Sequence, residues 1–237
     1  MSAPNTIGAL GVWTWIDTQS DNPPVFSEDG GVIPNGTSLA ITNPNSGGGQ
    51  IYYTTDGSDP RLPGNQNVTA LLPAESQCRY TIPEAEIPGW NTVDGPADLA
   101  GWNTGPAGLG YERTPGPYAT LINTNLPAGT TSAYARFEFE VAEQATLDAL
   151  TALNMRLQYD DGFVAYLNGV KVASANAPDT PAWNSVATST REGEVGTSIH
   201  TISLTSFKDE LLIGTNVLAI QLLNTGVTSN GLLCSPE

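Results

Sequence analysis

The sequence predicts an all-β protein with two β-sandwich domains. Apolar and polar residues alternate at period two in several segments, which is the pattern of half-buried strands. The 237 residues include 25 glycines and 18 prolines, which interrupt these segments at short intervals as turn residues do. A chain of this length can form two modest domains that each bury a core.

The N-terminal third contains the first group of predicted strands. Residues 1–22 hold one strand-like apolar run and form a separate N-terminal segment that ends before Pro23. Residues 37–42 and 50–55 then read as two strands. Because the segment between them is rich in Asn, Ser and Gly, a hairpin is the simplest connection. The first domain is placed at 23–82.

The remaining residues, 83–237, form the predicted second domain. Pro and Gly are dense in 83–132, which favours long ordered loops over strands. Asn168-Gly169 between two apolar runs is the signature of a type I′ hairpin, because both turn residues need positive φ. A short helix is expected at 143–152 on propensity. Strands are expected at 133–141, 154–159, 162–167, 170–173, 198–204 and 216–223.

The charge excludes some classes of partner. Eight Lys and Arg residues face 24 Asp and Glu residues, so the formal charge is -16. The basic residues are scattered singly, whereas a nucleic-acid binder needs a clustered basic face. We therefore expect no nucleic-acid partner. We also expect no membrane insertion, because no run of about 20 apolar residues occurs.

Residues 25–61 resemble the chitobiase C-terminal-like, fibronectin-type-III-associated repeat of secreted bacterial proteins. The resemblance rests on Pro24-Val25-Phe26-Ser27, on Gly30-Gly31 and above all on the segment from Ile51 to Arg61, which reads IYYTTDGSDPR. It implies a small immunoglobulin-like sandwich that acts as a structural or spacer module. Its closing strand is hard to identify unless 77–82 supplies it.

Residues from about 84 to 237 resemble the galactose-binding-like jelly-roll modules that follow such repeats in large exported proteins. The resemblance is carried by the segments 101–111, 135–139, 157–170, 181–184 and 214–220. It implies a secreted or cell-surface accessory module that is not an enzyme. Its partners would be a polysaccharide or cell-surface glycan and the other domains of the parent protein. The sequence ends at 232–237, where a final strand would be expected.

The candidate ligand-binding residues are Trp183, Asn184 and Tyr166. A flat indole can stack on the apolar face of a pyranose ring while neighbouring polar groups bond its hydroxyls. Trp183 lies in a polar loop, which suits this role. The alternative is that Trp183 folds back to cover one end of the sandwich. Trp90 and Trp102 are expected to be core or loop anchors.

Asp160 and Asp161 are the candidate metal ligands. Modules of the resembled kind sometimes carry a structural Ca²⁺, a cation that prefers oxygen ligands. The alternative is that both acids cap the turn that enters the hairpin, because adjacent carboxylates on a strand point to opposite faces. No other cofactor is expected.

Cys78 and Cys234 flank the second domain. The first and last strands of a jelly roll commonly lie side by side, so a disulfide between these residues would join the ends of the domain. Two free buried thiols are the alternative.

We expect no enzymatic activity: His200, the only histidine, sits in an apparent strand, and no nucleophile-elbow motif occurs. Paired carboxylates for glycoside hydrolysis are harder to exclude by sequence, with these candidates: Glu138, Glu140, Glu192 and Glu194.

Overall fold

The computed structural model describes residues 25–27, 38, 40–44, 69–191 and 193–237, in two compact units at 1–68 and 69–237. In the first unit β1 (Val25–Phe26) pairs antiparallel with β2 (Ile41–Thr42). β2 lies inside the strand expected at 37–42. The N-terminal segment, the strand expected at 50–55 and the motif at 51–61 lie outside the described residues.

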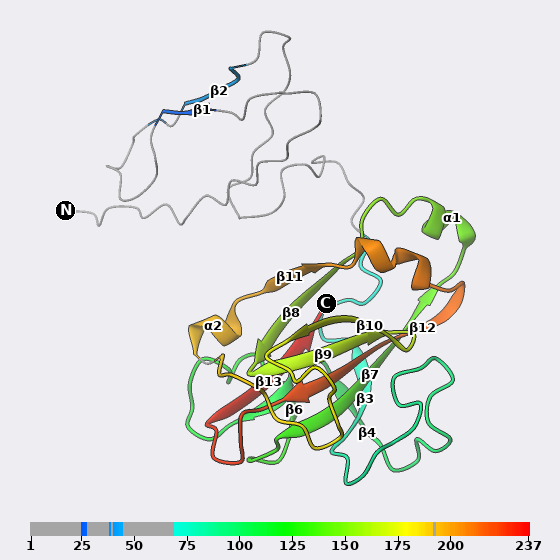
Figure 1. The fold of residues 1–237 in the computed structure, drawn as a ribbon, viewed down its shortest axis with the longest axis vertical. Coiled ribbons are helices and arrows are strands. Elements are labelled where there is room, and N and C mark those ends of the chain that lie inside the picture. Colours follow the sequence, from blue (N-terminus) through cyan, green and yellow to red (C-terminus); the bar gives the residue numbers. More distant parts are fainter. Residues whose placement is uncertain (1–24, 28–37, 39, 45–68, 192) are drawn as a thin grey trace, which may run out of the picture. The chain divides into compact units, whose positions relative to one another are not determined.

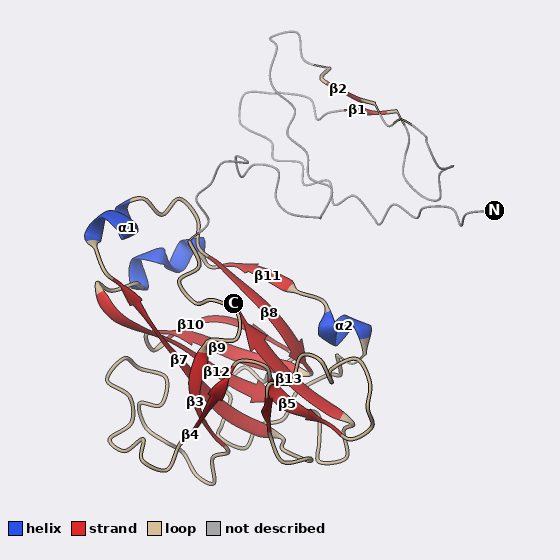
Figure 2. Cartoon of the chain, turned by 180° about the vertical axis from the view of Figure 1, so that it is seen from behind, coloured by secondary structure: helices blue, strands red, loops and turns tan. Residues whose placement is uncertain are grey.

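The second unit is a sandwich of two sheets (Figures 1 and 2). One sheet contains, in spatial order, β10 (Val170–Ala175), β9 (Gly162–Leu167), β12 (Gly214–Leu223), β7 (Ser132–Val141), β3 (Gln77–Thr81) and β4 (Asn103–Pro106). The other contains β11 (His200–Ser203), β8 (Asn154–Asp160), β13 (Gly231–Pro236), β5 (Leu109–Glu112) and β6 (Thr124–Asn125). The neighbouring strands in these sheets pair antiparallel, apart from β5 and β6, which pair parallel. The predicted all-β sandwich is therefore confirmed.

The core lies between the facing surfaces of the two sheets. β12 and β7 pair over ten residues each, from Gly214 opposite Val141 to Leu223 opposite Ser132. Alternate residues of β12 enter the core, where Leu218, Ile220 and Leu222 are buried with side chains from β8 and β13. This follows from strand geometry, because successive side chains of a strand point to opposite faces of the sheet.

The opposite face of the larger sheet is also buried. Val217, Ala219 and Leu223 of β12 point away from the core, and each is less than 1 % exposed. Two loops, 83–102 and 176–190, supply the side chains that cover this face. β12 therefore reads as an almost continuous apolar run, as a strand buried on both faces does.

The hairpin between β9 and β10 has the predicted turn. Asn168 and Gly169 have φ values of +51° and +96°. The Asn168 side chain also accepts a hydrogen bond from the backbone N–H of Val217, at 2.8 Å, and donates one to the backbone O of Glu210. The turn is thus tied to the neighbouring strand. The predicted helix at 143–152 is present as the shorter α1 (Gln144–Asp148).

The structure corrects the sequence analysis in the region 77–132. Residues 77–81 form β3, which pairs with β4 and β7 of the second unit, so this segment does not close the preceding sandwich. The boundary between the units lies at 68/69 instead of 82/83. β4, β5 and β6 lie within the segment expected to be loops. β5 lacks a clear strand pattern because it contains Gly110. Glycine is required there, since a Cβ on Gly110 would lie 2.0 Å from the backbone O of Leu232 on β13.

The C-terminus is also a strand. β13 occupies the centre of the smaller sheet, between β8 and β5, and does not stop short as the sequence analysis expected. Two further short helices, α2 (Glu194–Thr197) and the 3-10 helix η1 (Thr205–Glu210), flank β11. None of the helices in the described part of the chain is long and apolar enough to cross a membrane.

Candidate functional site

A group of aromatic side chains covers the outer face of the larger sheet. We call it the aromatic platform, and it consists of Trp90, Trp102, Tyr134, Tyr166 and Trp183. Trp90 stacks on Tyr134 of β7 with 3.8 Å between ring centroids and 3° between ring planes. The rings of Trp90 and Tyr166 of β9 meet edge to face, with 5.5 Å between their centroids and 80° between their planes. Strand residues thus form the base of the platform, and loop residues form its upper layer.

Arg136 fixes the loop that carries Trp90. This β7 residue is 2 % exposed, and its Nη1 donates hydrogen bonds to the backbone O of Trp90 at 2.6 Å and of Thr92 at 2.7 Å. Nη2 donates to the backbone O of Val93 at 3.5 Å. Within the described residues, its Nε has no hydrogen-bond partner. Burial lowers the pKa of the guanidinium, because desolvation disfavours its charge.

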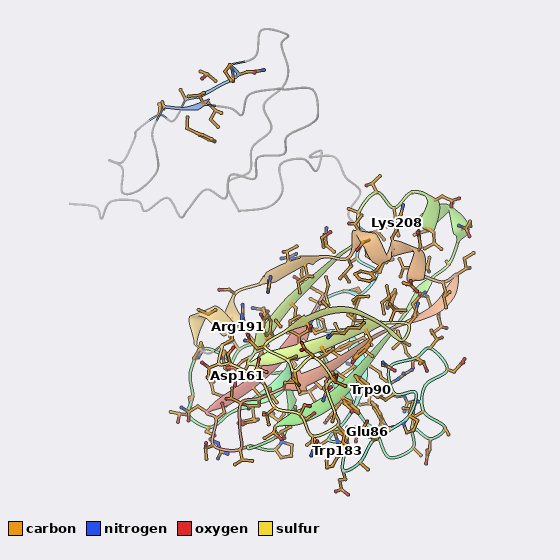
Figure 3. The ribbon with its side chains drawn as sticks, viewed as in Figure 1. Glu86, Trp90, Asp161, Trp183, Arg191 and Lys208 are labelled. Carbon is orange, nitrogen blue, oxygen red and sulfur yellow. The ribbon has the colours of Figure 1, made fainter. Side chains whose placement is uncertain are left out.

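A second loop brings Trp183 to the platform. The backbone O of Ala182 accepts a 2.8 Å hydrogen bond from Gln221 Nε2 of β12. The backbone N–H of Trp183 donates to Glu86 Oε1 at 3.0 Å, which links this loop to the loop of Trp90. Figure 3 shows Trp183, Glu86 and Trp90 close together, with Lys208 at the opposite end of the unit. Hydrogen bonds to the sheet and between the loops therefore position both indoles.

The platform combines buried and accessible rings. Trp90 and Tyr134 are 8 % and 2 % exposed, whereas Trp102, Tyr166 and Trp183 are half-buried. Burial raises the pKa of the Tyr134 phenol, and the nearby charge of Glu86 raises it further. Burial also raises the pKa of Tyr166. Both phenols therefore keep their protons at neutral pH and remain hydrogen-bond donors.

The structure places two of the three predicted ligand-binding residues on the platform. Tyr166 and Trp183 both pack against the buried cluster that contains Trp90 and Tyr134, and the predicted Asn184 follows Trp183 as an exposed residue. Trp90 is a buried loop anchor, as expected. The contribution of Tyr134 and Glu86 was missed, because it depends on contacts between segments that are distant in sequence. The outward-facing aromatic at position 134 of a predicted strand was the available signal.

Asp160 and Asp161 bind different groups. Asp161 is fully buried, and its Oδ1 accepts from the backbone N–H of Arg191 at 2.8 Å. Its Oδ2 accepts from the backbone N–H and hydroxyl of Thr225 at 2.9 and 2.7 Å. The Tyr118 hydroxyl donates to Asp160. The two carboxylates thus anchor three loops, and in the described ranges no three His, Cys, Asp or Glu side chains gather as metal ligands do.

Among the described residues, the other candidate acids do not form a pair of carboxylates across a cleft. Glu138 and Glu140 both lie on β7 and are exposed; Glu138 lies 3.8 Å from Arg136, and Glu140 accepts a hydrogen bond from Thr215 at 2.6 Å. Glu192 and the side chain of Glu194 lie outside the described residues. His200 is exposed on β11, with its Nδ1 3.5 Å from the Tyr159 hydroxyl.

Comparison with known proteins gives weak structural similarities. No family model and no curated protein match the chain. A calcium-binding mutant of Bacteroides uniformis beta-glucuronidase 2 is 11 % identical over 68 % of this chain and 17 % of its own, with a TM-score of 0.37. A glycosyl hydrolase family 2 member from Bacteroides cellulosilyticus is 12 % identical over 69 % of this chain and 20 % of its own, with a TM-score of 0.39. The chain spans about a fifth of the length of these enzymes.

Proposed function

We propose that this chain is a non-catalytic carbohydrate-binding or adhesion module of a larger exported bacterial protein, and that it binds a glycan at the aromatic platform. The observation that carries the proposal is the layered arrangement of the rings. Trp102, Tyr166 and Trp183 are partly accessible, and all three pack against the buried cluster that contains the Trp90–Tyr134 stack. Rings held in this way present apolar surface with little loss of conformational entropy on binding.

The surroundings of the platform suit a sugar. A pyranose ring has an apolar face that stacks on an indole and hydroxyl groups that need hydrogen-bond partners. Glu86 is exposed beside Trp183 and supplies a carboxylate, and Asn184 supplies an exposed amide. We propose that Trp183 and Tyr166 contact the sugar ring and that Asn184 and Glu86 bond its hydroxyls. The setting is the cell exterior, among other domains of the parent protein.

A second candidate function is a purely structural spacer or assembly module. It is favoured by the way the two loops seal the outer face of the sheet, since Trp183 is half-buried and its backbone is tied to Glu86. In that case the aromatic rings hold loops together and bind no ligand. The two functions differ in what removal of Trp183 does.

Affinity electrophoresis against a panel of soluble polysaccharides tests the proposal. We expect at least one glycan to retard the protein and Trp183→Ala to weaken that retardation by about tenfold or more, as loss of an aromatic hot spot does. Phe207→Ala is the matched control: it removes another half-buried aromatic ring, on η1 beside Lys208, and should leave retardation unchanged. If no glycan retards the wild-type protein, the spacer function replaces the binding function. Turnover of common glycosides would contradict the non-catalytic part.

A further inference from the structure

Two buried thiols lie at the corner where the chain passes from one sheet to the other. Cys78 is on β3, the first strand of the second unit, and Cys234 is on β13, the last. They are 3 % and 1 % exposed, and both belong to the same core cluster. Among the described residues, neither thiol is bonded to another sulfur. Their strands are in different sheets, so the expected side-by-side pairing of first and last strands is not present.

The corner between β4 and β5 is hydrogen-bonded to both cysteine-bearing segments. The backbone N–H of Ala107 donates to the backbone O of Ser76 at 2.9 Å, next to β3. The following residue, Gly108, donates its N–H to the backbone O of Cys234 at 3.1 Å. One dipeptide is therefore bonded to the chain beside Cys78 on one side and to Cys234 itself on the other.

The side chains at this corner point into a shared apolar space. Cys78 Sγ donates to the backbone O of Gly105 at 3.3 Å, which directs the thiol toward the corner. Burial raises the pKa of Cys234, and the charge of a Cys78 thiolate would raise it further. Both thiols thus lie in the core between the two sheets, one on each side of the corner.

We propose that Cys78 and Cys234 form an intersheet disulfide when the protein folds in the presence of an oxidant, so that the first and last strands of the unit are covalently joined. A small-molecule disulfide such as oxidised glutathione is a sufficient oxidant. One cysteine thiolate attacks it and forms a mixed disulfide, releasing one glutathione thiol. The second cysteine then attacks the protein sulfur and releases the other. The two cysteines lose two electrons and two protons in total, and the glutathione disulfide gains them.

The bond must form before the core closes. Burial raises the pKa of Cys78 to about 12, and exchange requires the thiolate. The folded protein therefore exchanges slowly in both directions: reduced protein resists oxidation, and oxidised protein resists reduction. Once formed, the bond closes a loop from residue 78 to residue 234. A stretching force applied to the two ends of the unit would then be carried by the disulfide, and β3 and β13 would stay in their sheets.

Refolding in a redox buffer tests the proposal. The wild-type chain is unfolded under reducing conditions, refolded with reduced and oxidised glutathione, and alkylated in denaturant without a reductant. We expect neither cysteine to be alkylated, an intact mass about 2 Da below that of the reduced chain, and a Tm roughly 10 °C above that of the Cys78→Ala, Cys234→Ala double variant. Each single variant provides a control in which the remaining thiol is alkylated.

Two outcomes would overturn the proposal. Alkylation of both thiols after refolding would show that the pair does not oxidise. A disulfide found only between two protein molecules would show that Cys78 and Cys234 of one molecule do not bond to each other. Should the double variant fail to fold, alkylation and intact mass of the wild-type chain still decide the question. None of these results depends on glycan binding.

Discussion

Trp90 and Tyr134 stack face to face although they come from a loop and from the centre of a sheet: their ring centroids are 3.8 Å apart and their planes differ by 3°. The stack joins the 83–102 loop to β7, and the accessible rings of the platform pack against the buried cluster that contains it. Its strength therefore sets both the stability of the covered face and the order of the proposed binding surface.

Removal of the Trp90 ring should destabilise the unit strongly. We expect Trp90→Ala to lower the free energy of unfolding by about 3 to 5 kcal/mol, because a buried indole is replaced by a cavity. Urea denaturation followed by circular dichroism measures this. Trp102→Ala is the comparison, and it should cost less because Trp102 is half-buried. Equal losses for the two variants would contradict the role of Trp90 as the anchor.

Removal of the Arg136 guanidinium should also be costly. Arg136→Ala removes the hydrogen bonds to the carbonyl groups of Trp90, Thr92 and Val93, and we expect a loss of about 3 kcal/mol in urea denaturation. Arg79 lies directly opposite on β3 but is exposed, so Arg79→Ala is the matched control. It should change stability by no more than about 0.5 kcal/mol. A similar effect of both variants would show that the buried hydrogen bonds contribute little.

Loss of the Asp161 carboxylate should loosen the loops it anchors. Asp161→Ala removes the acceptor for the backbone N–H groups of Arg191 and Thr225 and for the Thr225 hydroxyl. We expect a loss of about 2 to 4 kcal/mol, because three half-buried donors lose their acceptor at a fully buried position. Asp179→Ala changes an exposed acid upstream in the same connection and should have little effect. Proteolysis of the 176–199 segment, faster in Asp161→Ala alone, provides a second measurement.

Calcium should not change the melting temperature of the wild-type protein. Both oxygens of Asp161 already accept hydrogen bonds, and Asp160 accepts one from Tyr118, so a metal ion would have to compete with these donors. Differential scanning calorimetry with added calcium and with excess chelator measures the shift. A Tm that falls on chelation and recovers with calcium would instead support the metal site predicted from the sequence.

High pH should destabilise the reduced protein. The folded-state pKa of Cys78 is raised by burial from 9.0 to about 12, so the unfolded chain releases this proton first. The contribution of Cys78 to stability is therefore complete below pH 9 and is lost as pH rises toward 12, at about 1.4 kcal/mol per pH unit. Cys78→Ala should reduce the pH dependence of the unfolding free energy by that slope between pH 10 and 11. Identical slopes for the wild-type and variant proteins, both kept reduced, would argue against it.

The sequence by itself determined the strands whose signal is local. β7 and β8 alternate at period two, and Asn168-Gly169, which can take the positive φ values of the hairpin turn, follows the apolar run of β9, so neighbouring residues were sufficient to predict these elements. β4 and β5 were not predictable in this way. Their glycines permit close approach to other strands, and that requirement is set by partners far along the chain.

Only the tertiary structure decided where the candidate site lies. Alternation indicates which residues face away from the core, but it does not indicate what covers them. Burial of the outer face depends on Arg136, on Gln221 and on the contact between Glu86 and Trp183, all of which join residues that are distant in sequence. The same holds for the segments of Cys78 and Cys234, which are hydrogen-bonded to a single corner. Such contacts form only when the sheets are assembled, because the Arg136 and Gln221 side chains that hold the loops belong to strands β7 and β12.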